Sequence, residues 1–128
     1  MKGAASMEHN QIHGRAEYTI ETGKTEEFKK LAQDMRRAVE ANESGTKEYQ
    51  FYLDRTGTKC LVHGTYANSE AVLAHNTGIA SQTILPKIFR ISKISRFDVY
   101  GNPSEELQKV LTSFGVHTYY NLFAGFSR

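Results

Sequence analysis

Tryptophan is absent from the 128-residue sequence, cysteine occurs once and proline twice. The lone Cys60 cannot form a disulfide within the chain, and no CxxC or other metal-ligand spacing surrounds it. Stability must therefore come from a hydrophobic core, which a chain of this length can build by burying roughly two-thirds of its unfolded surface. A single reduced thiol is typical of a cytoplasmic protein, and we predict that location.

Strong charge of one sign and long apolar runs are also lacking. Sixteen basic and fourteen acidic side chains are interspersed along the chain and leave a net charge of +2. This balance does not favour nucleic acid or anionic lipid as a partner. No apolar run approaches the roughly 20 residues that cross a bilayer, so no membrane association is predicted. Residues 1–10 lack the apolar stretch of a secretory signal and are predicted to form a flexible lead-in.

Recognisable metal motifs are missing too. The sequence has no HExxH motif, and His9 and His13 lie in a segment that reads as extended or disordered, where their four-residue spacing does not converge on one ion. We predict no metal site.

What the sequence does contain is hydrophobic periodicity. Alternation in IHGRAEYTI predicts a half-buried strand whose core face carries every second residue from Ile12 to Ile20. Apolar side chains at three- and four-residue steps from Phe28 to Val39 predict a long amphipathic helix, with Thr25 as its cap. TKEYQFYLD and KCLVHGTYA alternate on either side of the turn RTGT and predict a hairpin.

Shorter helices and one more strand follow. SEAVLAHN predicts a helix that Asn68 or Ser69 caps and Gly78 ends. ILPKIFRIS predicts a further helical piece, in which Pro86 is tolerated only near the first turn. KISRFDVYG predicts a fourth strand, and NPSEELQKVLTSF predicts a late helix capped by Asn102.

The order strand, helix, strand, strand, helix, strand is the split βαβ or ferredoxin-like arrangement, an α+β fold with an antiparallel sheet. Two helices cover only one face of that sheet, yet the hairpin carries aromatic side chains on both faces, such as Phe51 and Tyr52. A homodimer with its sheets packed face to face would cover the second face.

We assign residues 11–101 to this domain and residues 102–128 to a C-terminal helix and an aromatic tail. The tail is predicted to dock on its own domain or, with slight preference, on the dimer partner.

The span from about residue 11 to residue 101 resembles the antibiotic biosynthesis monooxygenase family, especially its small quinol monooxygenase branch. The similarity rests on the segments ESGTKEYQFYLD and TYANSEAVLAHNTG, where the residues that follow the family pattern are Glu43, Gly45, Tyr49, Tyr66 and His75. The resemblance implies a dimeric α+β barrel with a pocket between sheet and helices. It also implies oxidation of a small hydroquinone-like or polyketide aromatic by O2 without a cofactor.

Two departures from the family pattern stand out. The glutamate that the family's third strand often carries two positions before its terminal aromatic is replaced by Gly64, so any role of that carboxylate is absent. Haem-degrading relatives rely on a tryptophan in the second helix, and the lack of tryptophan disfavours that activity.

Oxygenation without a cofactor needs an apolar slot, a base that titrates near neutrality, and donors for the oxyanion formed. His75 is the predicted catalytic base because it lies on the helix face that must look at the sheet. The alternative is a histidine that only interacts with the helix dipole. The candidate substrate-binding residues are Tyr49, Tyr66, His63, Asn76 and Arg90.

Two other functions stay open, because this fold carries many activities. The same pocket suits an isomerase or decarboxylase of a small carbonyl compound. The missing carboxylate also fits a non-catalytic ligand-binding dimer.

Overall fold

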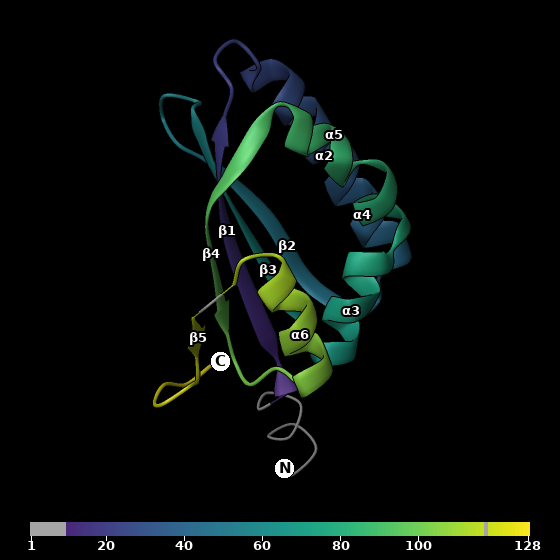
Figure 1. Cartoon of the computed structure of the whole chain (residues 1–128), viewed down its shortest axis with the longest axis vertical. Coiled ribbons are helices and arrows are strands. Elements are labelled where there is room, and N and C mark those ends of the chain that lie inside the picture. The colour runs from purple at the N-terminus through teal and green to yellow at the C-terminus, as the bar shows by residue number, and fades with distance from the viewer. Residues whose placement is uncertain (1–9, 117) are drawn as a thin grey trace.

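A computed structural model of the chain describes residues 10–116 and 118–128 (Figure 1). The strands within this part are β1 (Ile12–Ile20), β2 (Thr46–Leu53), β3 (Lys59–Tyr66), β4 (Ser92–Tyr100) and β5 (Tyr119–Tyr120). The helices are α2 (Thr25–Asn42), α3 (Ser69–Thr77), α4 (Ile79–Thr83), α5 (Leu85–Arg90) and α6 (Glu105–Ser113). Except for Asn10, the predicted lead-in over residues 1–10 lies outside the described residues.

The strands form one sheet in the order β2-β3-β1-β4-β5. The first four strands pair antiparallel, which confirms the predicted ferredoxin-like α+β fold. The fifth strand was not predicted, and it pairs parallel to β4, with Val99 opposite Tyr119. All labelled helices lie on one side of the sheet, so within residues 10–116 and 118–128 the opposite face carries no labelled helix (Figure 1).

The core lies between the central strand β1 and the long helix α2. Ile12, Ala16, Tyr18 and Ile20 are buried on one face of β1, as the alternation predicted. Ala16, Tyr18 and Ile20 pack in one cluster with the buried side of α2, where Met35 is fully inaccessible to solvent. Ile12 packs in a second cluster, with Val72 of α3 and Leu107 of α6. Each large apolar side chain buried here contributes roughly 1.5–3 kcal/mol to folding.

Two of the predicted helix caps are wrong. The N-cap of α2 is Lys24, and the Thr25 hydroxyl instead donates a hydrogen bond to the Gly57 carbonyl at 2.7 Å, which ties the helix start to the β2–β3 turn. Helix α6 is capped by Ser104 rather than Asn102; its hydroxyl accepts from the Leu107 N–H at 3.2 Å.

The segment between β3 and β4 forms the layer that covers the sheet beside α2. Asn68 caps α3, accepting from the Ala71 N–H at 2.9 Å, and Gly78 ends it, both as predicted. The helical piece predicted in ILPKIFRIS corresponds to α5, and Pro86 lies in its first turn, where its missing N–H is harmless. Helix α4, which lies between Gly78 and this piece, was not predicted.

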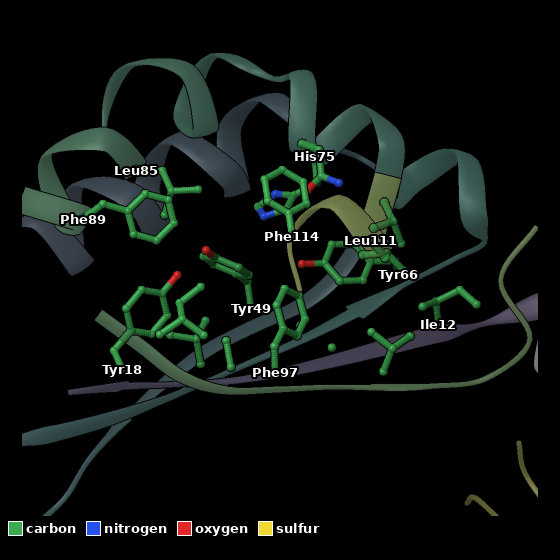
Figure 2. Close-up of a pocket in the computed structure, with 18 residues that line it drawn as sticks. Ile12, Tyr18, Tyr49, Tyr66, His75, Leu85, Phe89, Phe97, Leu111 and Phe114 are labelled. Atoms are coloured by element: carbon green, nitrogen blue, oxygen red, sulfur yellow. The ribbon is translucent and has the colours of Figure 1, made fainter. Parts of the chain in front are cut away.

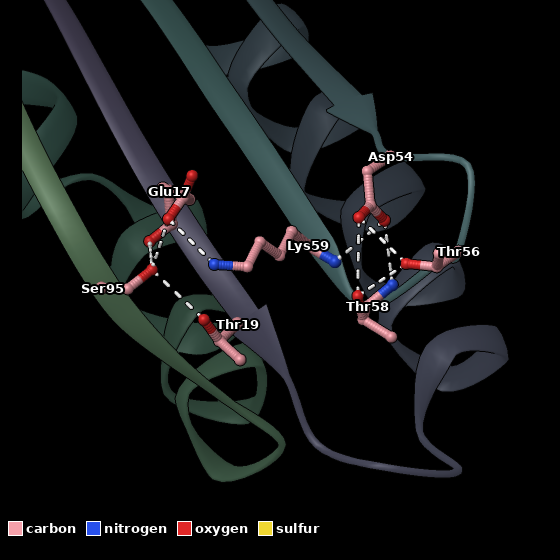
Figure 3. Close-up of polar contacts among 7 residues, drawn as sticks. All are labelled: Glu17, Thr19, Asp54, Thr56, Thr58, Lys59 and Ser95. Carbon is pink, nitrogen blue, oxygen red and sulfur yellow. Dashed lines mark hydrogen bonds and ion pairs between the residues drawn. The ribbon is translucent and has the colours of Figure 1, made fainter.

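Polar contacts fix the turn between β2 and β3 and link the strands of the helix-free face (Figure 3). The Asp54 Oδ1 accepts from the backbone N–H groups of Thr58 at 3.0 Å and Lys59 at 3.1 Å. The bond from Lys59 is the main reason that the pKa of Asp54 lies below its usual value. The Glu17 carboxylate on β1 contacts the Lys59 ammonium at 3.5 Å and the Ser95 hydroxyl at 2.9 Å, and so links β3 and β4.

Several apolar side chains remain exposed in the single chain. Tyr52 on the helix-free face is 54% exposed, and beyond β5 the tail exposes Leu122, Phe123 and Phe126 by 74%, 99% and 81%. Among the helices of the described residues, none has the length and apolar character needed to cross a membrane.

Candidate active site

A cavity of about 110 Å³ lies between the sheet and the helical layer (Figure 2). Its floor comes from alternate residues of β1, β3 and β4, and its walls come from α3, α5 and α6. Most of the lining is apolar or aromatic. The side chains that bring polar atoms to it are Tyr18, Tyr49, Tyr66, His75 and Asn76.

His75 lies in the last turn of α3, and the whole residue is 8% exposed. Its Nδ1 is 2.6 Å from the Glu43 Oε1, and both side chains are largely shielded from water. A carboxylate on one ring nitrogen favours the tautomer with the proton there and fixes the ring plane. The Nε2 atom has no hydrogen bond to any described residue, so it is free to take a proton from a ligand.

Glycines allow Glu43 to reach the helix. Gly45 follows it closely in the chain, and a Cβ on Gly45 would lie 2.6 Å from the Ala71 Cβ, closer than real Cβ contacts allow. A Cβ on Gly78 would lie 3.2 Å from the Glu43 Oε2. The Thr46 hydroxyl donates to the Oε1 at 2.9 Å, so the carboxylate is fixed from its own loop as well. The Glu43 Oε2 is buried and finds no hydrogen-bond partner among the described residues.

Two tyrosine rings flank the imidazole. The ring centroids of Tyr49 and Tyr66 are 5.2 and 5.4 Å from that of His75. Burial raises the pKa of Tyr49 well above its usual value, with a smaller contribution from Tyr66, and burial likewise raises the pKa of Tyr66. Both hydroxyls therefore keep their proton at physiological pH and can donate it in a hydrogen bond to a ligand.

The orientation of the Tyr66 side chain explains why a glycine occupies position 64. The Tyr66 ring lies back over β3, and a Cβ at position 64 would be 2.7 Å from the ring Cζ and closer still to the hydroxyl oxygen. The Tyr66 side chain thus occupies the space that a side chain at position 64 would need.

The structure brings four of the six predicted site residues together. Asn76 lines the cavity beside His75, and its Nδ2 is buried without a partner among the described residues. His63 lies on the opposite, helix-free face, where its ring stacks on His13 at 5.9 Å. Arg90 is exposed at the end of α5 and does not line the cavity.

Three further residues belong to the site. Glu43 followed the family pattern but had no predicted role, because its contact with His75 spans 32 residues. Tyr18 was placed on the core face of the first strand, which is the face that lines the cavity. Phe114, 55% exposed, forms part of the cavity lining directly after α6, and no pattern in the sequence marks it as a site residue.

The sequence matches the model of the antibiotic biosynthesis monooxygenase family over residues 12–84, more than half of the chain. The chain belongs to this family. The match contains β1 to α4 and therefore the Glu43–His75 pair, Tyr49, Tyr66 and Asn76.

Solved structures share the fold. MupZ from Pseudomonas fluorescens is 24% identical, covering 93% of this chain and 95% of that chain, with a TM-score of 0.78. A mutant of SnoaB from Streptomyces nogalater, named as a cofactor-independent oxygenase, is 9% identical over 74% of this chain and 95% of that chain, with a TM-score of 0.63. Rv0793 from Mycobacterium tuberculosis is 15% identical over 74% and 97%, with a TM-score of 0.62. No curated protein matches the sequence.

Proposed function

We propose that this protein is a cofactor-independent monooxygenase that oxidises a small hydroquinone-like or polyketide aromatic with O2. Family membership supports this reaction class, and so does the fold shared with SnoaB, which is named as such an oxygenase. The observation that carries the proposal is the histidine–carboxylate pair in the wall of an apolar cavity. Such a pair can remove a proton from a bound phenol in a space that largely excludes water.

Proton removal is the first step. A substrate hydroxyl donates its proton to the His75 Nε2, while the Glu43 carboxylate on Nδ1 stabilises the positive charge that forms on the ring. The neutral hydroxyls of Tyr49 and Tyr66 donate hydrogen bonds to the phenolate oxygen. Donors fixed in a low-dielectric cavity stabilise such an oxyanion more than water does.

The second step is electron transfer to O2. A phenolate is electron-rich enough to reduce O2 by one electron, and recombination of the two radicals forms the new carbon–oxygen bond. Overall, one oxygen atom enters the ring and the other leaves as water with two hydrogens from the substrate. The substrate supplies all the electrons, so the balance needs no further reductant.

Oxygen uptake with a panel of hydroquinones tests the proposal. We expect wild-type turnover, one 18O atom per product molecule under 18O2, and a loss of roughly 10²- to 10⁴-fold in kcat for His75→Ala, the usual contribution of a general base. His13→Ala, which alters a histidine on the opposite face, is the matched control and should keep wild-type uptake. Absence of uptake, or uptake that His75→Ala leaves unchanged, would refute the mechanism.

Proton-transfer isomerisation or decarboxylation of a small carbonyl compound is the second candidate. The specific observation in its favour is that the Glu43–His75 pair and the tyrosine hydroxyls are acid–base groups, which need no O2 to move a proton. Turnover under argon would select this function. Ligand binding without turnover in either atmosphere would select a non-catalytic binding protein.

We also propose that residues 11–101 with the segment 102–128 work as a cytoplasmic homodimer. Tyr52, Leu61 and Tyr100 line an open groove on the helix-free face together with His13, Arg15 and His63. A second copy of the same face would cover this mixed aromatic and basic surface.

A further inference from the structure

Tyr18 brings a third hydroxyl into the cavity, at the end remote from His75. Its ring is only 7% exposed, stacks on Phe89 at 6.1 Å and meets Phe28 edge-on at 6.0 Å. Figure 2 shows its hydroxyl pointing from the sheet into the space below Phe89, while His75 and Tyr66 lie at the other end. The ring is thus fixed by packing, and only the hydroxyl faces the cavity.

This hydroxyl has no partner within the described part of the chain. Buried tyrosines normally satisfy their hydroxyl, because a donor left unpaired away from water costs free energy. Tyr49 and Tyr66 are likewise without a hydrogen bond to a described residue, so three donors converge on one small cavity. An assembly of unpaired donors in an otherwise apolar space fits a ligand that carries acceptor oxygens.

The charges around the cavity restrict the ligand further. No Lys, Arg, Asp or Glu lines it among the described residues, and Arg90 is exposed outside it. The nearest charged group on the wall behind His75 is the Glu43 carboxylate, which would repel an anion. A carboxylate or phosphate would therefore be desolvated without a compensating cation.

We propose that Tyr18 forms a second polar subsite, where its hydroxyl donates a hydrogen bond to one oxygen of an uncharged aromatic ring whose other oxygen faces His75. This proposal rests on the proposed function in one respect, which is that the substrate oxygen to be deprotonated faces His75. Because a cavity of about 150 Å³ holds one benzene molecule, the volume of about 110 Å³ found here limits the ligand to no more than a single ring. Tyr18 then selects substrates that carry oxygen at both ends of the ring.

Binding under argon tests this subsite apart from oxygenation. The full chain is titrated by NMR with three ligands. Hydroquinone carries two ring oxygens, phenol carries one, and 4-hydroxybenzoate carries a hydroxyl and a negatively charged carboxylate. We expect hydroquinone to bind about three- to tenfold more tightly than phenol, the gain from one hydrogen bond. We expect 4-hydroxybenzoate to bind at least about tenfold more weakly than hydroquinone because its charge finds no partner.

Tyr18→Phe keeps the packed ring and removes the hydroxyl alone. We expect it to weaken hydroquinone binding about three- to tenfold and to change phenol binding by less than about twofold. Tyr52→Phe, on the helix-free face, is the matched control and should change neither. Equal losses for both probes, no loss for hydroquinone, or no hydroquinone binding by the wild type would overturn the proposal. Intact selectivity without oxygen uptake would instead refute only the proposed oxygenation.

Discussion

Glu43 and His75 show how much of the site depends on one side-chain contact. Their atoms approach to 2.6 Å only because Gly45 and Gly78 let the loop before β2 lie against α3. The carboxylate does not line the cavity, so it acts through the imidazole and is a positioning residue. At the scale of single residues, the basicity of the site thus depends both on His75, which lines the cavity, and on Glu43, which does not.

Glu43→Gln tests this positioning role. The amide keeps the shape of the side chain but cannot stabilise a positive imidazole, so we expect kcat to fall about 10- to 10⁴-fold with little change in KM. Steady-state kinetics over a range of pH would check both values, and the pH profile should move as well. Glu40→Gln, on the exposed face of α2, is the control and should behave as the wild type. A rise in KM alone would show that Glu43 only shapes the cavity.

At the scale of elements, strand β3 requires a glycine at position 64, where the Tyr66 side chain leaves no space for a Cβ. Gly64→Ala would place a methyl group against the Tyr66 ring, which is itself packed into the second core cluster. We expect a loss of about 1–3 kcal/mol in the free energy of unfolding, typical of overpacking. Denaturant titration would measure it. Gly14→Ala on the neighbouring strand is the control, because its Cβ would meet only the Phe97 ring at 3.7 Å, and an equal loss there would contradict the explanation.

Features that depend on residues close together in the sequence could be predicted, whereas features that depend on contacts between distant residues could not. Alternation along β1 is a local property of one strand, so its buried face was predicted correctly. The cap at Thr25 failed because its hydroxyl bonds to Gly57, 32 residues away, and no local pattern reports that choice. The same limit applies to His63. The sequence predicts that His63 lies on the third strand, but which face of that strand the helices cover is decided by the packing of the whole sheet.

At the scale of the whole molecule, the cavity lies where two hydrophobic clusters meet. One contains Tyr18 and α2, the other contains Tyr66 and α6, and Phe97 packs against both. The family match ends at residue 84, whereas the likeness to MupZ covers 93% of the chain. That share is too large to omit the whole of residues 102–128. Leu111 and Phe114 in this segment line the cavity, so the C-terminal part contributes to the candidate site.

The exposed tail gives the last prediction. Strand β5 anchors the tail on β4, and beyond it Leu122, Phe123 and Phe126 have little contact with the single chain. Burying such side chains is worth about 1.5–3 kcal/mol each, so we expect them to dock on the partner in the proposed homodimer. Deleting residues 121–128 retains β5 and should weaken dimer association at least about tenfold in analytical ultracentrifugation. It should leave hydroquinone binding unchanged.

Single substitutions separate docking from general damage to the chain. Phe123→Ser should reproduce part of the loss in association, because Phe123 is 99% exposed in the single chain and removing it costs the fold nothing. Ser127→Ala, four residues later, should leave association at the wild-type level. A wild type that sediments as a monomer at micromolar concentration would refute the dimer. If deleting residues 121–128 leaves the dimer equally stable, the tail does not dock on the partner, because the apolar area removed would then have contributed nothing to association.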